Sequence, residues 1–243
     1  MQTRYFLTAG TLLATTFFVA TTFLTVSTCW AGQGGGGRQG ACIATQTASL
    51  QPVSPQERAG LIYMYEEEKL ARDVYTTLAN QYQVPIFRRI SASEQRHMDA
   101  VLRLLQASQI NGPKTNATGV FTDVQLAELY RQLVAKGEKS YIDALQVGAT
   151  IEDLDIYDLQ QYIAGTENQA ILRVYQNLAK GSRNHLRAFT GQLQANNTEY
   201  TAQYLDQQTV DTILATAQER GPVDSQGMAM SKQNRGKQRQ RWQ

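Results

Sequence analysis

The most informative segment of the chain is Ser91-Ala-Ser-Glu94-Gln-Arg-His97-Met-Asp-Ala-Val101. At helical spacing, Glu94 and His97 share one face with Ile90 and Val101, so apolar residues lie on both sides of the polar pair. Both polar side chains are therefore expected to point inward. Because an ionised carboxylate is not buried without a partner, the segment predicts a buried polar site that other parts of the chain must complete.

The preceding region predicts a helix whose inward face also carries a carboxylate. Ser54-Pro55-Gln56-Glu57 combines a capping serine, a proline at the first helical position and a glutamate at the third. The inward stripe that follows consists of Leu61, Met64, Glu68, Ala71, Tyr75 and Leu78. Three glutamates follow one another here, and the helical phase favours Glu68 as the one that points inward. Glu67 is the alternative, because a neighbouring stripe is nearly as apolar. Glu66 is expected to be solvated.

A third helix is expected after Ser140, which has the side chain of a helix cap. Its inward stripe contains two acids one turn apart, Glu152 and Asp155, and Gly148 lies one turn before them. Because glycine has no side chain, Gly148 predicts the close approach of a neighbouring helix or a ligand. The alternative is that both acids belong only to an acidic helix end.

A fourth helix is expected after Thr166-Glu-Asn-Gln169, which has the pattern of a capping box. The inward stripe of this helix contains His185, and the chain has only one other histidine, His97. A lone inward histidine is more often a core residue than a ligand. Two histidines at matching positions of capped helices favour a shared site.

These four polar interruptions predict one metal centre. Its candidate ligands are Glu68, Glu94, His97, Glu152, Asp155 and His185. Converging carboxylates repel one another strongly at low dielectric constant, and a divalent or trivalent cation removes that repulsion. A mixed set of carboxylates and imidazoles suits iron or manganese, with zinc as an alternative. The sequence has no CxxC pair, so a zinc site made of thiolates is not expected.

The fold class predicted from these patterns is all-α, because no segment alternates in the manner of a strand. We expect a four-helix bundle over residues 54–205, with a short amphipathic helix that is capped by Asp123 and runs to Lys136, in a long crossover between the second and third helices. Residues 206–220 are expected to add a helical extension. The remaining residues, 221–243, are predicted to form a basic, disordered tail.

The amino terminus has the features of a secretory signal. Arg4 precedes an apolar run over residues 5–26, and Ala31 is a small residue at a plausible cleavage point. Residues 1–31 therefore predict export to the periplasm or the extracellular space, followed by a flexible, Gly-rich linker over residues 32–53. Two alternatives are an uncleaved membrane anchor formed by residues 5–26 and a lipoprotein modified at Cys29.

Several segments between Glu57 and about Tyr204 match a known pattern. They are Tyr63-Met-Tyr-Glu-Glu-Glu-Lys-Leu-Ala-Arg-Asp-Val-Tyr75, Ala92-Ser-Glu-Gln-Arg-His-Met-Asp-Ala-Val101, Phe121-Thr-Asp123, Val147-Gly-Ala-Thr-Ile-Glu-Asp-Leu-Asp-Ile156 and Gly181-Ser-Arg-Asn-His-Leu-Arg-Ala-Phe189. The order of ligands resembles the ferritin-like superfamily, and the segments resemble most closely the domain of unknown function 2202. The resemblance implies a four-helix bundle with a metal centre and implies no particular reaction.

The chain departs from the di-iron pattern of that superfamily at one position. The fourth helix has Ser182 where a Glu-x-x-His motif would place a glutamate. Asp155 could replace the missing carboxylate from the neighbouring helix. Otherwise one metal position lacks a ligand, and the site is mononuclear, asymmetric or open to a substrate. Arg183 and Arg187 could pair with the acids, or could face solvent.

Three functions are compatible with these features. The first is an exported oxidoreductase whose iron or manganese centre reacts with oxygen, peroxide or ferrous iron, with Tyr65 and Tyr75 as candidate redox-active residues. The second is a metal-binding or storage module without catalysis, and the third is a structural envelope protein with a metal-free core of ion pairs. Metal ions and a small oxidant are the expected partners, together with a second copy of the chain and a membrane contact through either terminus. No nucleic acid is expected.

Overall fold

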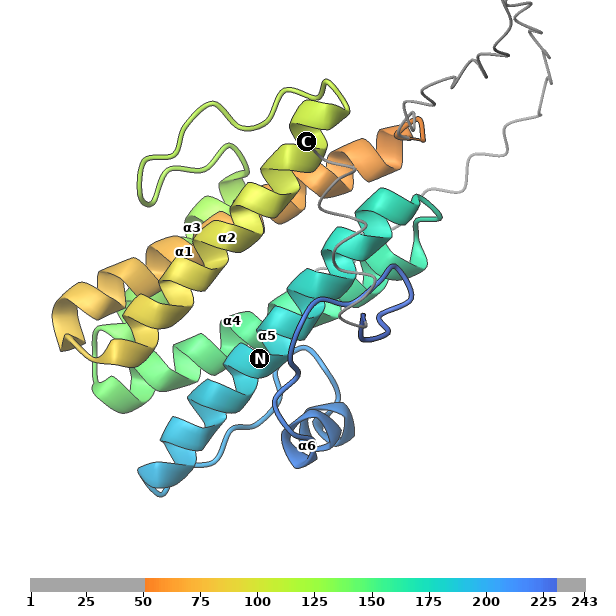
Figure 1. Cartoon of the computed structure of the whole chain (residues 1–243). Helices are drawn as coiled ribbons and strands as arrows, with labels where there is room; N and C mark the ends of the chain where they lie inside the picture. Colours follow the sequence, from red (N-terminus) through yellow and green to blue (C-terminus); the bar gives the residue numbers. More distant parts are fainter. Residues whose placement is uncertain (1–50, 231–243) are drawn as a thin grey trace, which may run out of the picture. The chain divides into compact units, whose positions relative to one another are not determined.

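The computed structural model describes residues 51–230, which form six α-helices and contain no strand (Figure 1). The helices are α1 (Pro55–Tyr82), α2 (Pro85–Ala107), α3 (Val124–Gly137), α4 (Tyr141–Ala164), α5 (Gln169–Ala195) and α6 (Gln207–Ala215). The prediction of an all-α fold is therefore confirmed for this part of the chain. The predicted signal or anchor, Cys29, nearly all of the linker and residues 231–243 lie outside the described residues.

The four long helices pack side by side, with α1 along α2 and α4 along α5 (Figure 1). Contacts between α2 and α5 and between α1 and α4 join the two pairs, and α3 packs against α1 and α4. From residue 51 to residue 230, none of the helices has both the length and the apolar character that a membrane span requires.

The apolar core consists of two clusters with a polar layer between them. On α1, one cluster contains Leu61 and Met64 and the other begins at Leu70. On α5, the first cluster ends at Ala179 and the second begins at Leu186. Between the two clusters, α1 carries Glu68 and α5 carries His185. The corresponding segment of α2 carries Glu94 and His97. The helices therefore bring the polar interruptions to one level of the core.

Three of the four predicted helix caps are confirmed. Ser54 and Glu57 form the reciprocal capping box of α1, Asp123 caps α3 and Ser140 caps α4. The fourth prediction is wrong, because Asn168 and not Thr166 caps α5, and its side chain accepts hydrogen bonds from the first backbone amides. The Thr166 hydroxyl instead accepts a hydrogen bond from the Asn168 amide and thereby stabilises the turn before the helix.

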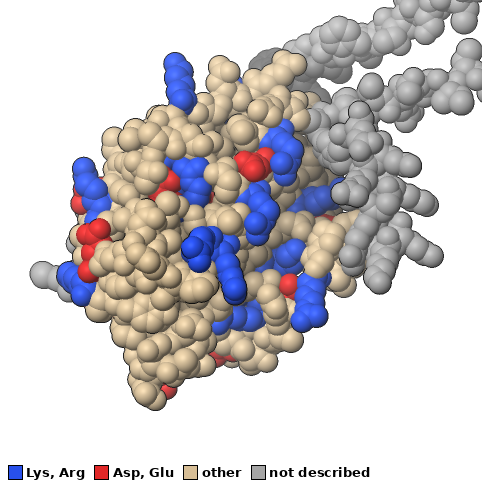
Figure 2. Space-filling model, turned by 60° about the vertical axis from the view of Figure 1, so that its left-hand side comes forward, with Lys and Arg blue, Asp and Glu red and all other residues tan. Residues whose placement is uncertain are grey.

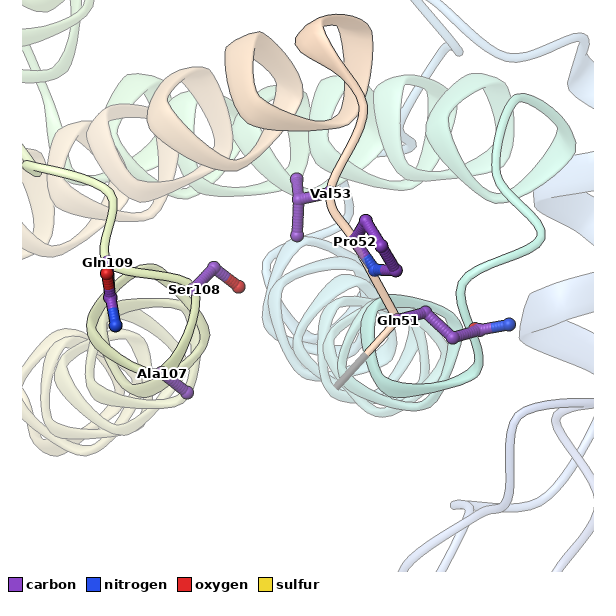
Figure 3. A pocket seen from close by; sticks show the side chains of 6 residues that line it. All are labelled: Gln51, Pro52, Val53, Ala107, Ser108 and Gln109. Atoms are coloured by element: carbon purple, nitrogen blue, oxygen red, sulfur yellow. The ribbon is translucent and has the colours of Figure 1, made fainter. Parts of the chain in front are cut away.

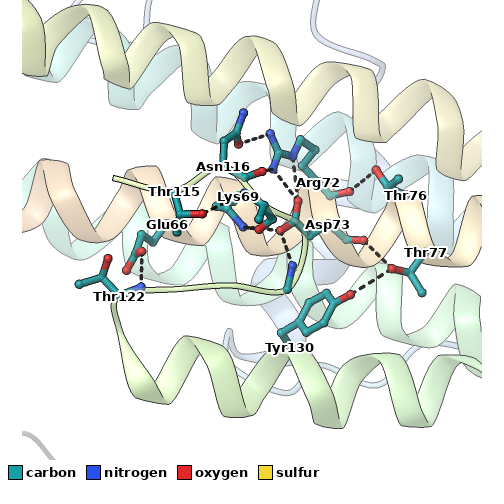
Figure 4. Close-up of polar contacts among 12 residues, drawn as sticks. Glu66, Lys69, Arg72, Asp73, Thr76, Thr77, Thr115, Asn116, Thr122 and Tyr130 are labelled. Atoms are coloured by element: carbon teal, nitrogen blue, oxygen red, sulfur yellow. Dashed lines mark hydrogen bonds and ion pairs between the residues drawn. The ribbon is translucent and has the colours of Figure 1, made fainter. Parts of the chain in front are cut away.

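A buried ionic cluster on α1 holds the loop between α2 and α3 (Figure 4). Lys69, which is completely buried, contacts Asp73 at 2.5 Å and donates a 2.7 Å hydrogen bond to the carbonyl of Ala117. Asp73 also accepts from the Gly119 amide at 3.0 Å and from the Arg72 guanidinium at 2.6 Å. We call Lys69, Arg72 and Asp73 the loop clamp, because their charges pair with one another on α1 and their remaining polar atoms bind the loop.

Glu66 differs from its prediction, because its side chain is buried and not solvated. Its two carboxylate oxygens accept hydrogen bonds of 2.6 and 2.8 Å from the backbone amides of Thr122 and Asp123 (Figure 4). These amides lie just before α3. The helical phase of α1 did not reveal this role, because the partners come from a loop more than fifty residues away.

The segment after α5 contains α6, which lies within the predicted helical extension, and a second ordered segment that was not predicted. Residues 216–230, which we call the C-terminal strap, contain an antiparallel bridge between Val223 and Ala229 and run back along α5 (Figure 1). Val223 is buried, and it exchanges hydrogen bonds of 2.9 and 3.1 Å with Asn177 of α5. Residues 221–230 are therefore not the disordered tail that the composition suggested.

Candidate metal centre

The first group of predicted ligands consists of Glu68 from α1 and Glu94 and His97 from α2. His97 Nδ1 lies 3.1 Å from Glu68 Oε2 and 2.7 Å from Glu94 Oε2. The two carboxylates are buried, and 13 % of the His97 side chain is exposed. One ligand atom from each residue lies within 4.8 Å of the others, which is a spacing that suits a common metal ion.

The second group consists of Glu94 again, Glu152 from α4 and His185 from α5. His185 Nδ1 lies 2.8 Å from Glu94 Oε1 and 3.4 Å from Glu152 Oε2. These ligand atoms also lie within 4.8 Å of one another. Glu94 presents one oxygen to each histidine, so the two groups are adjacent and share one carboxylate. The arrangement therefore offers two neighbouring metal positions with Glu94 between them.

Burial and the charged neighbours shift the pKa of each candidate ligand in these two groups. Burial lowers the pKa of His185, but the carboxylates of Glu94 and Glu152 outweigh burial and raise it to about 10. Burial raises the pKa of Glu68, the His97 imidazole lowers it, and the net value is about 7. Glu94 is also buried, yet the two histidines hold its pKa well below the usual range. Without a metal, protons compensate the buried acids.

Several ligand atoms have no hydrogen-bond partner within the described part of the chain. They are Glu68 Oε1, Glu94 Oε1 and His185 Nδ1, all of which are buried. Glu94 Oε1 and His185 Nδ1 are close together, but their orientation does not make a hydrogen bond. Buried polar atoms without a partner are rare, because each costs about 1–3 kcal/mol. Oxygen and nitrogen atoms that converge without partners are suited to a metal ion.

Asp155 is the one predicted ligand that belongs to neither group. It is buried on α4, and Ser182 of α5 donates a hydrogen bond to its Oδ2. Burial and the neighbouring carboxylates of Glu68 and Glu152 raise the pKa of Asp155 well above its usual value. Ser182 therefore holds Asp155 beside the centre. Both groups contain two carboxylates and one histidine without Asp155.

Tyr75 of α1 supports the second group in a way that its apolar stripe did not reveal. Its hydroxyl donates a 2.6 Å hydrogen bond to Glu152 Oε1 and lies 3.2 Å from the carbonyl oxygen of Gly148. This contact leaves Glu152 Oε2 as the oxygen that faces His185. Outer partners of this kind orient ligating carboxylates and tune the metal. The prediction that Gly148 permits close approach is confirmed, because the Phe189 ring packs directly on it.

Glu67, the alternative to Glu68, lies in a neighbouring acidic environment. It is buried, and neither of its carboxylate oxygens has a hydrogen-bond partner among the described residues. Burial and the charge of Asp158 raise the pKa of Glu67 well above the usual range. Tyr63 donates a long 3.4 Å hydrogen bond to Asp158 at the outer side of this pair.

Arg183 and Arg187 do not pair with the acids of the centre. Both contact Glu219 of the C-terminal strap, with Arg183 in a two-point interaction of 2.7 and 2.6 Å. The sequence left open whether these side chains pair with the acids or face solvent, and the structure shows a third outcome, which is pairing with the strap. No arginine or lysine therefore neutralises the two metal groups among the contacts of residues 51–230.

A surface pocket lies away from this centre, beside the beginning of α1 and the end of α2 (Figure 3). It is lined by Gln51, Pro52, Val53, Ala107, Ser108 and Gln109 and has a volume of about 210 Å³. None of these side chains is acidic, basic or nucleophilic in character beyond one serine. This surface pocket therefore offers no chemistry comparable with that of the centre.

Comparisons with known proteins agree with one another. A family model described as an uncharacterized protein domain, DUF2202, matches residues 57–217. The uncharacterized protein MJ0754 of Methanocaldococcus jannaschii is 52 % identical over 172 residues, which cover 70 % of this chain and 93 % of the relative. The crystal structure of hypothetical protein MJ0754 matches with a TM-score of 0.69 and covers 70 % of this chain and 97 % of that one.

Proposed function

Because the chain belongs to the DUF2202 family of uncharacterized domains, we propose its function from the chemistry of its centre. We propose an oxidoreductase with a dinuclear iron centre that reacts with oxygen, peroxide or ferrous iron, with manganese or zinc as alternative metals. The ligands would be Glu68, Glu94, His97, Glu152 and His185. Asp155 would act beside them, as a partner of Ser182 and not as a direct ligand.

One observation carries the proposal, which is the convergence of buried ligand atoms without hydrogen-bond partners around Glu94. A structural ion-pair core would satisfy these atoms with arginine or lysine, and Arg183 and Arg187 are instead engaged with Glu219. Two carboxylates and one imidazole at each of two adjacent positions suit iron or manganese. The proposal therefore rests on the donor set and on the absence of a competing cation among the described residues.

The arrangement of the helices supports a ferritin-like bundle. One helix contributes a single glutamate, the next contributes Glu94 and His97, and a long crossover containing α3 separates them from the second pair. In ferritin-like proteins, glutamates from two helices and Glu-x-x-His motifs from two others face a common centre. This chain would differ in its fourth helix, where Ser182 replaces the glutamate and Glu94 serves both positions.

The residues of the chain would divide the work as follows. Bound iron would supply the one-electron redox chemistry. Glu94 would hold the two positions together, and Tyr75 would fix the orientation of Glu152 through its 2.6 Å hydrogen bond. The histidines would bind through Nδ1, which faces the carboxylates in both groups. The two apolar clusters would limit the access of water from either end of the polar layer.

We also propose that the protein acts outside the cytoplasm, in the periplasm or the extracellular space. The support is the amino-terminal pattern of Arg4, the apolar residues 5–26 and Ala31. Retention by residues 5–26 or by a lipid on Cys29 is the alternative, and pairing with a second copy of the chain is a further expectation. Mass spectrometry of the mature protein from its native host would identify the amino terminus and any lipid.

The test of the metal centre makes the same substitution at a buried glutamate and at an exposed one. Glu94→Gln removes the shared ligand, and Glu128→Gln changes an exposed glutamate of α3. We expect two metal ions per chain in the wild type and in Glu128→Gln, and almost none in Glu94→Gln, measured by elemental analysis. We also expect Glu94→Gln to consume aerobic ferrous iron no faster than buffer. Full metal content in Glu94→Gln would refute the proposed centre.

A metal-holding module without catalysis is the second candidate, and Ser182 favours it because the di-iron pattern has a carboxylate there. The same experiment separates the two functions. Two bound ions in a wild-type protein that oxidises ferrous iron only at the rate of buffer would support storage or structural binding. A wild-type rate well above that of buffer, lost in Glu94→Gln and retained in Glu128→Gln, would support the oxidoreductase.

A further inference from the structure

A pocket lies directly over the two histidines, between α2 and α5. It has a volume of about 410 Å³ and opens to solvent. His97 and Ser93 of α2 and His185 and Asn184 of α5 form part of its wall, and Gln218 of the C-terminal strap completes one side. The small exposed part of each histidine, 13 % for His97 and 12 % for His185, is consistent with this opening.

The two histidines present unused hydrogen-bond donors to this pocket. Nδ1 of each ring faces the buried carboxylates, so Nε2 lies on the opposite side of the ring; for His97 that side lies against Gly181, which also lines the pocket. A histidine that binds a metal through Nδ1 carries its proton on Nε2, and that N–H usually donates to a carboxylate, a carbonyl or water. Among the contacts of residues 51–230, none provides such an acceptor for either Nε2. The acceptor is therefore solvent or a molecule bound in the pocket.

The charge of the pocket decides which acceptor it favours. Arg89, Arg96 and Lys180 line it, and no aspartate or glutamate does. Arg89 and Arg96 are exposed, and Lys180 is fixed at the wall by a 2.6 Å hydrogen bond to the carbonyl of Gly221 in the strap. The face of the folded domain that Figure 2 shows carries more basic than acidic side chains. Three cations around two N–H donors favour an anion.

We propose that this pocket binds a small oxyanion with two or more negative charges, of the size of phosphate. Its oxygen atoms accept hydrogen bonds from Nε2 of His97 and of His185, and the two arginines pair with its charge. The two rings are stacked with their centroids 5.6 Å apart, so one oxyanion spans both donors. The bound anion thereby supplies the outer partner that the histidine ligands lack.

This inference rests on the proposed metal centre, because the metal fixes the proton of each ring on Nε2. It also limits the substrates that approach through this pocket. A hydrated divalent cation is repelled by the three basic side chains, whereas an anion or an anionic metal chelate is attracted. The pocket therefore selects anionic reactants on the histidine side of the centre.

The experiment uses the full protein loaded with zinc, which is diamagnetic and does not change its oxidation state. Binding of inorganic phosphate is measured by calorimetry at fixed ionic strength, and the imidazole nitrogen signals are recorded by nitrogen-15 NMR. We expect phosphate to shift the Nε2 signals of both histidines and to leave Nδ1 nearly unchanged. The double variant Arg89→Gln/Arg96→Gln should bind phosphate at least about tenfold more weakly, because two of three cations are removed.

The matched control is Arg88→Gln, which removes the same charge from an exposed neighbour outside the pocket. We expect less than a twofold change in phosphate affinity and unchanged zinc content. A wild-type protein that binds zinc but no phosphate, or a control as weak as the double variant, would overturn the inference and leave the metal centre standing. A protein that takes up no zinc would refute the centre and, with it, the inference that rests on it, whether or not phosphate binds.

Discussion

The positions of single side chains in this protein depend on close contacts with a neighbouring helix. His97 provides the clearest case, because its ring lies against Gly181 of α5. A Cβ atom at position 181 would lie 2.6 Å from His97 Cε1 and Nε2, which is closer than carbon and nitrogen atoms approach. Gly181 therefore determines where a ligand from α2 can stand, although it offers no ligand atom itself.

Substitution of Gly181 by alanine should displace His97 and weaken the first metal position. The control is Gly191→Ala, on the same helix, where a Cβ atom would meet nothing within 4 Å. Helix propensity alone would make both variants more stable by about 0.5–1 kcal/mol. We expect Gly191→Ala to follow that trend with full metal content, and Gly181→Ala to retain about one ion in elemental analysis. Two tightly bound ions in Gly181→Ala would contradict this view.

Tyr75→Phe tests the hydrogen bond that orients Glu152. We expect the affinity of the second metal position to fall by about tenfold or more, as is usual for the loss of an outer partner of a ligand. Tyr175→Phe is the control, because the Tyr175 hydroxyl is buried but has no hydrogen-bond partner. Competitive titration with a chelator measures both affinities. Equal affinities in the two variants would remove Tyr75 from the centre.

The metal-free protein should lose stability as the pH rises above neutrality. His185 has a folded pKa of about 10 against an ordinary value of 6.5, so the folded state binds this proton more tightly than the unfolded state. The stabilisation is complete below pH 6.5 and is lost as the pH rises through 10. Glu68, with a folded pKa of about 7 against 4.5, acts in the same direction at lower pH.

Thermal unfolding between pH 7 and pH 10 measures this effect. We expect the melting temperature of the metal-free wild type to fall across that range and the fall to be smaller in His185→Asn, which lacks the proton. The metal-loaded protein should show little change, because metal replaces the protons. A melting temperature of the metal-free protein that rises with pH would contradict the assignment of protons to the centre.

At the level of the helix, α1 differs from an ordinary amphipathic element, because it carries buried charges on more than one side. Glu68 faces the centre, while Glu66 and the loop clamp face the segment between α2 and α3. Lys69 also lies 4.3 Å from the centre of the Phe121 ring. Charged side chains of α1 therefore hold the loop mainly through hydrogen bonds to its backbone, and Phe121 adds an apolar contact with the core.

Loss of one member of the clamp should destabilise the domain severely. Asp73→Ala leaves the buried Lys69 and the neighbouring Arg72 without their carboxylate, which costs about 3–5 kcal/mol in comparable buried pairs. Arg131→Gln breaks an exposed pair on α3 and should leave the stability unchanged. Urea unfolding of both variants measures the difference. Equal midpoints would show that the clamp contributes nothing to the fold.

At the level of the domain, the C-terminal strap joins the end of the chain to α5 and contributes Gln218 to the pocket over the histidines. The strap begins at the end of the region that the family model matches and extends beyond it. Its attachment depends on polar contacts with the outer face of α5, above all those of Glu219 with Arg183 and Arg187. The strap is therefore attached to the bundle by these polar contacts and by the buried side chain of Val223.

Glu219→Gln should loosen the strap and leave the bundle intact. Hydrogen exchange of residues 217–230 should become faster, because two cation contacts are weakened, while protection in α1, α2, α4 and α5 stays as it was. Glu199→Gln, at another exposed acid, is the control. Slower or unchanged exchange in the strap of Glu219→Gln would show that other contacts hold it.

Local pattern alone predicted the helices, most of their caps and the inward direction of Glu68, Glu94, His97, Glu152 and His185. Helical periodicity and capping depend on residues within about one turn of one another, so the sequence alone is enough to recognise them. The spacing of Glu94 and His97 belongs to this class. The predicted metal, export and reaction remain predictions.

Only the tertiary structure decided which side chains meet across helices and loops. Ser182 with Asp155, Glu66 with the amides before α3, and Arg183 with Glu219 join positions that are 27, 56 and 36 residues apart. Nothing in helical phase distinguishes a buried acid paired with a distant amide from a solvated one. The partners of polar groups depend on how whole helices pack, because burial and its compensating hydrogen bonds arise only when distant segments come together.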